Sequence, residues 1–211
     1  MTIHRDVRKS RPIGKPPAGP YSSDMTASLR PKPLFTLALI LAAAIAILWA
    51  MGRPPICTCG EIDLWIGAAD SPKTSQMLAD WYSPSHVIHG VLFYAALWWI
   101  ARSLSVEWRL VIATLVETAW ELLENTPWAI QHYREATIAI GYTGDSILNT
   151  FSDIIMMALG FFLARKLPIW ASAAIVVALE LAALAAIRDN LTLNVWMFLA
   201  PNDAIKAWQA G

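Results

Sequence analysis

Hydrophobic residues gather in five long stretches along the chain, and shorter polar segments separate them. The stretches cover residues 33–51, 85–101, 108–124, 147–164 and 168–187. Each is close to the roughly 20 residues that an α-helix needs to cross about 30 Å of hydrocarbon. The pattern therefore predicts an all-α fold, a polytopic membrane bundle of about five transmembrane helices within residues 33–190.

The first and third stretches differ most in character. Stretch 33–51 lacks a clear small-residue cleavage site near its end, so we expect an uncleaved membrane anchor. Stretch 108–124 is the least apolar, because it contains Glu117 and Glu121 and ends at Glu124. We therefore expect this helix to insert only together with its neighbours.

The two ends of the chain fall outside these stretches. Residues 1–32 are basic and rich in proline, without apolar periodicity, which predicts a disordered cytoplasmic tail attracted to anionic lipid headgroups. Residues 191–211 are too short to span a membrane again and are interrupted by Pro201. We expect them to form an interfacial C-terminal tail on the outer leaflet.

The segment between the third and fourth stretches contains two helix-start signals. Pro127 suits the first position of a short interfacial helix. Asp145 or Ser146 suits the N-cap of the helix that follows.

Composition supports a membrane protein and excludes a nucleic-acid binder. Of 211 residues, 56% are hydrophobic and 15% are charged, whereas soluble domains carry about a quarter charged residues. The 16 basic and 16 acidic residues give no net charge, and nucleic-acid binding would need a basic surplus.

The distribution of basic residues predicts the orientation. Eleven of the 16 Lys and Arg residues lie before the first stretch, between the second and third, at the very start of the third, or directly after the fourth. Because basic residues concentrate on the cytoplasmic side, the expected topology is N-in, C-out, in a bacterial inner membrane. Tryptophans near the ends of the stretches agree with an aromatic belt.

Two cysteines, Cys57 and Cys59, lie in the segment between the first and second stretches. Cysteines this close in sequence rarely bond to each other without strain, and further cysteines that would complete a metal site are missing. We therefore expect incidental or partner-linked thiols.

Four carboxylates, those of Glu117, Glu121, Glu124 and Asp153, lie inside the apolar stretches or at their edges. Each costs roughly 2.5–3.5 kcal/mol near the bilayer centre and less toward its edge. No Lys or Arg lies deep inside the stretches to neutralise them. They must be protonated, hydrated, paired with histidine or bound to a cation.

Helical spacing places polar residues of three stretches at one level. His86 and His89 lie three residues apart and share a helix face, as do Asn149 and Asp153 at four. Counted from the outer end of its own helix, His89 lies about 6 Å deep, Glu121 about 6 Å and Asp153 about 10 Å. The convergence predicts a polar site that opens to the periplasm.

The proposed roles divide this site into two parts. For catalysis we select His86, His89, Glu121 and Asp153, supported by Glu117, Glu124 and Asn149; the first four could instead bind a divalent cation. For an anionic substrate group we select Arg134 and the turn formed by Gly144, Asp145 and Ser146 at a helix start. The alternative is a network that only holds helices together. Glu180, in the fifth stretch, is expected to be a solvated or snorkelling side chain outside the site.

Three segments, SPSHVIHG, ETAWELLENTPWAI and GYTGDSILNTFSDIIMMALG, carry a resemblance. With them the chain resembles an uncharacterised family of multi-pass alphaproteobacterial inner-membrane proteins. The order of His, Glu and Asp residues is also distantly similar to VanZ-type membrane proteins. The resemblance implies that the protein lies in the membrane and that these three motifs matter for its function. It does not indicate any reaction.

Three functions fit these features. The first is a hydrolase or transferase that acts on a lipid or lipid-linked headgroup, with the bilayer and this substrate as partners. The alternatives are a non-catalytic scaffold for envelope assembly and a subunit of a proton- or ion-coupled transporter. Full activity after alanine replacement of the His–Glu–Asp set would favour the scaffold over both others, and ion flux in liposomes would favour the transporter.

Overall fold

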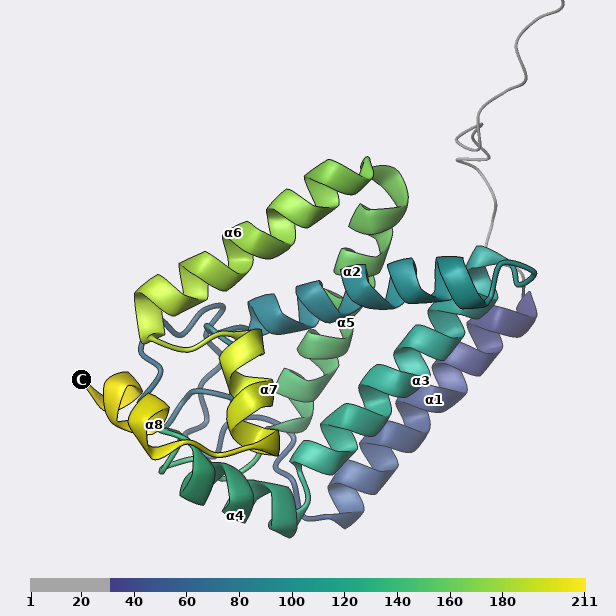
Figure 1. Cartoon of the computed structure of the whole chain (residues 1–211). Coiled ribbons are helices and arrows are strands. Elements are labelled where there is room, and N and C mark those ends of the chain that lie inside the picture. Colours follow the sequence, from purple (N-terminus) through teal and green to yellow (C-terminus); the bar gives the residue numbers. More distant parts are fainter. Residues whose placement is uncertain (1–30) are drawn as a thin grey trace, which may run out of the picture.

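The computed structural model describes residues 31–211 of the chain (Figure 1). The helices in order are α1 (Pro31–Ala50), α2 (Ser83–Ile100), α3 (Val106–Glu124), α4 (Pro127–Ala136), α5 (Ile147–Lys166), α6 (Ile169–Ile187), α7 (Leu191–Leu199) and α8 (Asp203–Ala210). The predicted tail 1–32 lies outside the described residues, apart from Pro31 and Lys32, which begin α1.

The all-α prediction is confirmed for residues 31–211, where the only β-type pairing is an isolated bridge between Ile66 and Asp80. The five apolar stretches correspond to α1, α2, α3, α5 and α6, and the predicted ends agree with the observed ones to within two residues. Length and apolar composition are therefore sufficient to place these helices.

Three of the described helices are long and apolar enough to cross a membrane by length and composition alone, namely α1, α5 and α6. The predicted number of about five spans is therefore matched only in part. Helix α3 carries Glu117 and Glu121, and α2 carries His86 and His89. These polar residues lower the mean hydropathy of α2 and α3, the two helices that carry the histidines and glutamates of the predicted site.

Figure 1 shows how the long helices run relative to one another. Helices α1 and α3 lie side by side in the same direction, and α2 runs the opposite way. The α2–α3 and α5–α6 connections lie at one end of the bundle, and the short helices α4, α7 and α8 lie at the other (Figure 1). The chain alternates in direction from each long helix to the next, as a multi-pass bundle requires.

Helices α2 and α5 make the closest contact between long helices, because two glycines lie at their crossing. A Cβ atom added to Gly90 would lie 1.9 Å from the backbone oxygen of Met157. A Cβ atom added to Gly160 would lie 1.9 Å from the backbone oxygen of Val87. Small residues allow helix backbones to approach this closely. The crossing sets the distance between the histidines of α2 and Asp153 of α5.

Helices α4 and α5 begin where the sequence signals predict. The Thr126 hydroxyl caps α4 by accepting a hydrogen bond from the backbone N–H of Ala129 at 3.2 Å. Ser146 rather than Asp145 caps α5, and its hydroxyl accepts from the N–H of Asn149 at 3.1 Å. In the C-terminal tail, Phe198 of α7 is buried against α4, so the tail packs on the protein itself.

The loop formed by residues 52–82 is held against the start of α5 by three backbone hydrogen bonds. The N–H groups of Ser146, Ile147 and Leu148 donate to the carbonyls of Ser75, Pro54 and Pro55 at 3.0, 2.9 and 3.1 Å. The side chain of Asn149 adds a fourth bond, to the carbonyl of Met77 at 3.0 Å. The loop therefore forms a fixed cover over the polar end of the bundle.

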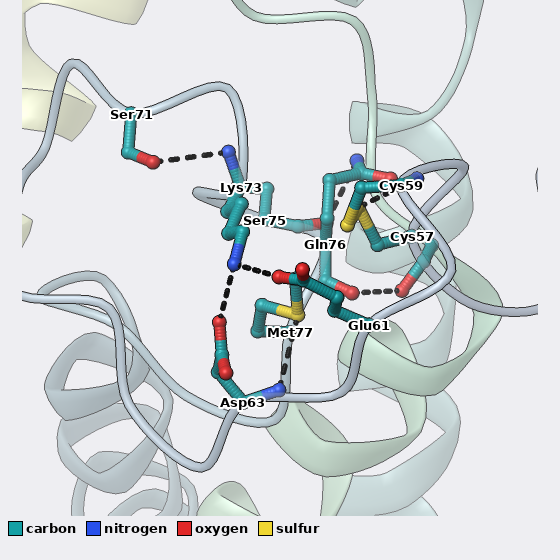
Figure 2. Close-up of a disulfide and its surroundings, with 10 residues drawn as sticks. Cys57, Cys59, Glu61, Asp63, Ser71, Lys73, Ser75, Gln76 and Met77 are labelled. Atoms are coloured by element: carbon teal, nitrogen blue, oxygen red, sulfur yellow. Dashed lines mark hydrogen bonds and ion pairs between the residues drawn. A yellow bond between two sulfur atoms is a disulfide. The ribbon is translucent and has the colours of Figure 1, made fainter.

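The expectation of incidental or partner-linked thiols in this loop is wrong, because a disulfide joins Cys57 to Cys59 (Figure 2). The chain turns here, and the N–H of Gly60 donates to the carbonyl of Cys57 at 3.0 Å. The turn brings the two Cα atoms to 5.2 Å, which lies within the range that disulfides occupy. Lys73 bonds to Glu61 and Asp63 nearby and ties the next part of the loop together.

Candidate functional site

A cavity of about 360 Å³ lies where the start of α2, the end of α3 and the first half of α5 meet. Loop 52–82, the segment 137–146 and the start of α7 complete its walls. Its ionisable lining residues are Asp70, Asp80, Tyr82, His86, His89, Glu121, Glu124, Tyr133, Tyr142, Asp145 and Asp153. Within the described part of the chain, no Lys or Arg side chain lines this cavity.

Glu117 of α3 lies between the two histidines of α2 and is completely buried. Its Oε1 atom lies 2.6 Å from Nδ1 of His86. Its Oε2 atom lies 3.0 Å from Nδ1 of His89. The sequence predicts only a supporting role for Glu117, behind Glu121, but the structure makes it the residue that joins both histidines.

These two hydrogen bonds determine what the rest of each imidazole ring can do. A carboxylate only accepts hydrogen bonds, so both Nδ1 atoms carry the proton and donate it to Glu117. In a neutral imidazole the other nitrogen, Nε2, is then an acceptor. His86 and His89 therefore each retain one basic nitrogen that is free of Glu117.

His86 also approaches the carboxylates on the other side of the cluster. Its Nε2 atom lies 3.8 Å from Oδ2 of Asp153, and its Nδ1 atom lies 3.3 Å from Oε1 of Glu121. Both carboxylates are buried, and Oε1 of Glu121 and Oδ1 of Asp153 have no hydrogen-bond partner among the described residues. We call His86, Glu121, Asp153 and Glu117 the cluster. It combines the Nε2 atom of His86 with two buried carboxylate oxygens that accept no hydrogen bond from the described residues.

A second group of polar side chains lies nearer the loops. Asp145 accepts hydrogen bonds from Nδ2 of Asn125 at 2.6 Å and from the Tyr142 hydroxyl at 3.1 Å. Glu124 accepts one from the Tyr133 hydroxyl at 2.7 Å. Burial raises the pKa of Asp145 to about 6, although its hydrogen bonds with Asn125 and Tyr142 oppose this shift.

The proposed anion site at the start of α5 finds no free donor in the structure. The N–H groups of Ser146, Ile147 and Leu148 already bond to loop carbonyls, and that of Asn149 bonds to the Ser146 hydroxyl. Gly144 has a φ of 89°, and a Cβ atom there would lie 1.9 Å from Nη1 of Arg53. An anion at this helix start would therefore have to displace protein contacts.

Arg134 also lies away from the cavity. It is in the last turn of α4, and its Nε atom donates to the carbonyl of Ile140 at 3.1 Å. Nearness in sequence to the polar turn suggests a shared site, but the α4 helix directs this side chain to the segment 137–142 instead. Of the four residues selected for an anion, Asp145 alone lines the cavity.

Sequence reasoning missed several residues that shape the site. Asn125 is completely buried and bonds to Asp145 in both directions, through its side-chain nitrogen and through its side-chain oxygen. Tyr133, Tyr142 and Asn194 are further lining residues. The motif ENTP marks Asn125 as a helix end, whereas the tyrosines carry no local signal because distant segments bring them to the cavity.

Glu180 lies outside the cavity lining, as expected, and its partly exposed side chain also has partners within the protein. Its carboxylate accepts hydrogen bonds from the backbone N–H groups of Leu191 at 2.9 Å and Thr192 at 3.2 Å. These are the first two residues of α7. Carboxylates at a helix start satisfy N–H groups that lack a partner within the helix, so Glu180 fixes α7 beside the cavity.

Three groups of side chains place potential metal-ligating atoms within 4.8 Å of one another. They are His86, His89 and Glu117; His86, Glu121 and Asp153; and Glu121, Glu124 and Asp145. In the first group, hydrogen bonds to the histidines occupy the Glu117 oxygens. In the third group, Asn125 and Tyr142 occupy the Asp145 oxygens. The second group retains the most free ligand atoms.

Comparisons with known proteins give the chain relatives along most of its length. The model of a family described as a protein of unknown function (DUF2585) matches residues 48–211. A UPF0314 protein of Paracoccus denitrificans is 55% identical over 175 residues, covering 83% of this chain and 90% of that protein. A UPF0314 protein of Sphingopyxis alaskensis is 51% identical over 174 residues, covering 82% and 93%.

No solved structure matches the chain, and none of these relatives supports the likeness to VanZ-type proteins. The matched region contains every residue of the cluster, from His86 to Asp153. The resemblance to an uncharacterised family is confirmed, and the chain belongs to the DUF2585 family of proteins of unknown function.

Proposed function

We propose that this protein is an integral inner-membrane enzyme, a hydrolase or transferase that acts on a lipid or lipid-linked headgroup at the outer leaflet. Helices α1, α2, α3, α5 and α6 span the membrane, with the N-terminus in the cytoplasm and the C-terminus in the periplasm. The cavity beside His86 is its active site.

The exposed surface of the long helices supports the membrane location. In the most apolar 18 residues of α1 only 17% are buried inside the protein, and in those of α6 only 11% are. Soluble monomers rarely expose this much continuous apolar surface to water. In a membrane, lipid tails would cover it. The carboxylates of α3 point inward, with Glu117 and Glu121 buried, while Leu115 and Val116 are exposed.

The ends of the helices support the orientation. Arg102, Arg165 and Lys166 lie at the end of the bundle that contains the α2–α3 and α5–α6 connections. Basic residues favour the cytoplasmic side, so the opposite end, with the cavity, faces the periplasm. The disulfide of loop 52–82 agrees with this side, because disulfides persist in oxidising compartments.

One observation carries the enzymatic role: a cavity of about 360 Å³ is lined by two histidines and several carboxylates without a single Lys or Arg from the described residues. A purely structural network would fill its own volume, as interiors are close-packed. Ionisable groups in a membrane bundle usually mark function. The cavity size also suits a headgroup, since small-molecule sites measure about 300–1,000 Å³.

The chemistry that fits is acid–base catalysis at an ester of the headgroup. The basic nitrogen of His86 or His89, or the carboxylate of Asp153, accepts the proton of water or of an acceptor hydroxyl, whose oxygen forms the new bond to the headgroup. The bond to the leaving oxygen breaks, and a protonated group of the cluster returns a proton to that oxygen. Water as the acceptor gives hydrolysis, and a lipid or glycan hydroxyl gives transfer.

The test is a lipid profile of a strain that lacks the gene, compared with strains that carry it back. Wild-type protein and the control Glu135→Gln, on the exposed face of α4, should restore the profile of the parent strain. Asp153→Asn and His86→Gln should not restore it, although the proteins are present in the membrane. A profile identical in all strains, or restored by both variants, would exclude this function.

The scaffold remains the second candidate because of one observation, the Glu117 hydrogen bonds that join α2 to α3. Such bonds between helices stabilise bundles in lipid. A scaffold requires the fold alone, so Asp153→Asn would support envelope assembly as well as wild type does. The same complementation experiment therefore separates the two functions.

A further inference from the structure

We propose that His86, Glu121 and Asp153 bind one divalent transition-metal or zinc ion, and that Glu117 is the positioning residue that presents the Nε2 atom of His86 to it. This inference rests on the proposed function, because it supplies the cation that such an active site needs. It also narrows the ligand set that the sequence suggests, since His89 is left out.

Two carboxylate oxygens of the cluster lack the partners that burial demands. Oε1 of Glu121 and Oδ1 of Asp153 are buried without a hydrogen-bond partner among the described residues, in side chains that are 1% and 5% exposed. A buried acceptor without a partner costs about 1–3 kcal/mol, and a charged one costs more. A cation bound to both carboxylates would remove this cost.

His86 has the chemistry of a third ligand. Because Nδ1 of His86 donates to Glu117, Nε2 is the nitrogen that the neutral ring can offer to a metal, and it lies 3.8 Å from Oδ2 of Asp153. Metal-ligating histidines almost always donate their other N–H to a carboxylate or carbonyl, which fixes the tautomer and the ring orientation. Here Glu117 is the carboxylate that accepts the N–H of His86, and the proposed ion would lie at the opposite nitrogen, Nε2.

The spacing of the three side chains suits a single ion. One ligand atom of each residue lies within 4.8 Å of the others, so small side-chain movements would bring all three to the distance of about 2.0–2.2 Å at which nitrogen and oxygen bind zinc. Catalytic zinc sites use three protein ligands and leave a position for water or substrate. Imidazole with carboxylates suits zinc, manganese or iron rather than copper(I) or iron–sulfur clusters.

The charge of the cavity also calls for a cation if the substrate is anionic. A phosphate-bearing headgroup would meet several carboxylates and no described Lys or Arg in this cavity. A divalent ion would neutralise the charges of Glu121 and Asp153 and polarise the substrate oxygen. The site would then accept an anionic headgroup without the basic residues that other phosphate sites use.

The test uses full-length protein without a histidine tag, purified in detergent micelles and dialysed to equilibrium against buffered Zn²⁺. Elemental analysis should find one Zn²⁺ per chain in the wild type and in the controls His132→Gln and Glu135→Gln. His86→Gln, Glu121→Gln and Asp153→Asn should lose it under the same dialysis. Glu117→Gln should retain one ion but bind it about 10–100-fold more weakly, as expected for a residue behind the ligand.

A second readout does not depend on the variants folding. Imidazole and carboxylate ligands also bind Cu²⁺. Wild-type protein loaded with Cu²⁺ is therefore examined by electron spin-echo envelope modulation, which counts the imidazole rings bound to the ion. The expected signal is that of one coordinated imidazole, His86. Two imidazoles, no imidazole, a wild type that retains no Zn²⁺, or an Asp153→Asn variant that retains as much as wild type would each overturn the proposal.

These results are separate from the lipid profile. If Zn²⁺ binds as described but the profile never depends on the gene, the proposed function fails and the metal site stands. If the profile requires His86 and no metal binds, the metal site is overturned, while the function stands and the cluster acts through acid–base chemistry alone.

Discussion

The carboxylate of Glu117 lies 2.6 Å from Nδ1 of His86, although the two residues are 31 positions apart in the chain. The contact joins α3 to α2 at the level where α5 brings Asp153. It fixes which nitrogen of His86 is free, and so links the packing of the bundle to the chemistry of the cavity.

Loss of this carboxylate should destabilise the protein. Glu117→Ala removes the acceptor of the Nδ1–H groups of His86, which is buried, and His89, which is partly buried. A buried donor that loses its partner costs about 1–3 kcal/mol. The midpoint of unfolding in detergent micelles should fall accordingly. Glu135→Ala, on the exposed face of α4, should stay within about 0.5 kcal/mol of wild type. Equal stability of the two variants would show that the Glu117 contacts contribute nothing.

The glycine crossing gives a second prediction. In Gly90→Ala the new Cβ atom would lie 1.9 Å from a backbone oxygen of α5, so α2 and α5 must separate. Overpacking against backbone should cost on the order of 3 kcal/mol, despite the gain in helix propensity. Gly141→Ala is the matched control, because nothing lies within 4 Å of its Cβ position. The same unfolding assay measures both, and a stabilised Gly90→Ala would contradict the crossing.

The proposed topology predicts the activity of reporter fusions. A periplasm-active reporter should be active after Arg53, Pro127 or Gly211 and silent after Arg102 or Lys166, because α1, α2, α3, α5 and α6 each cross once. Activity after Arg102 would mean that α2 does not return to the cytoplasm. The cavity would then lie on the wrong side for an outer-leaflet substrate.

Asp189, directly after α6, predicts a dependence of stability on pH. Burial raises its pKa to about 6, against a usual value of 3.8, although hydrogen bonds from Asn190, Asn194 and Gln209 oppose the shift. The folded state therefore holds the proton more tightly than the unfolded state. Its contribution is full below pH 3.8 and is lost as the pH rises to about 6.

The free energy of unfolding should decrease by about 1.4 kcal/mol for each pH unit between these two pKa values. Unfolding of wild type and of Asp189→Asn, measured from about pH 4 to pH 7, isolates this residue from other titrating groups. The wild type should lose more stability than the variant across this range. If the free energies of unfolding of the two proteins changed with pH in parallel, the pKa of Asp189 would not be raised in the folded state.

The long helices could be predicted from the sequence because their signal is local. Apolar runs of sufficient length, together with Pro127 and the Asp145–Ser146 pair at helix starts, place the boundaries without any tertiary information. The period of the helix likewise places Glu117, Glu121 and Glu124 on one face of α3.

The contacts of the site depend on segments far apart in the chain and could not be predicted in this way. Ser146 bonds to Ser75, 71 residues earlier, and nothing local at either position indicates it. The bonds of Glu180 to the start of α7 and the direction of Arg134 away from the cavity depend on how the connecting turns fold. The Cys57–Cys59 disulfide depends on a single turn at Gly60.

The proposed function requires that the cavity lined by His86, Glu121 and Asp153 transforms a membrane lipid. To measure this, purified protein loaded with Zn²⁺ is reconstituted into liposomes made from the total membrane lipid of the parent strain. Mass spectrometry then follows the lipids over time, with Asp153→Asn and the exposed control Asp203→Asn alongside. We expect one lipid species to decrease and a product to appear with wild type and Asp203→Asn, but not with Asp153→Asn. The same change with Asp153→Asn, or no change with wild type, would contradict the proposed function.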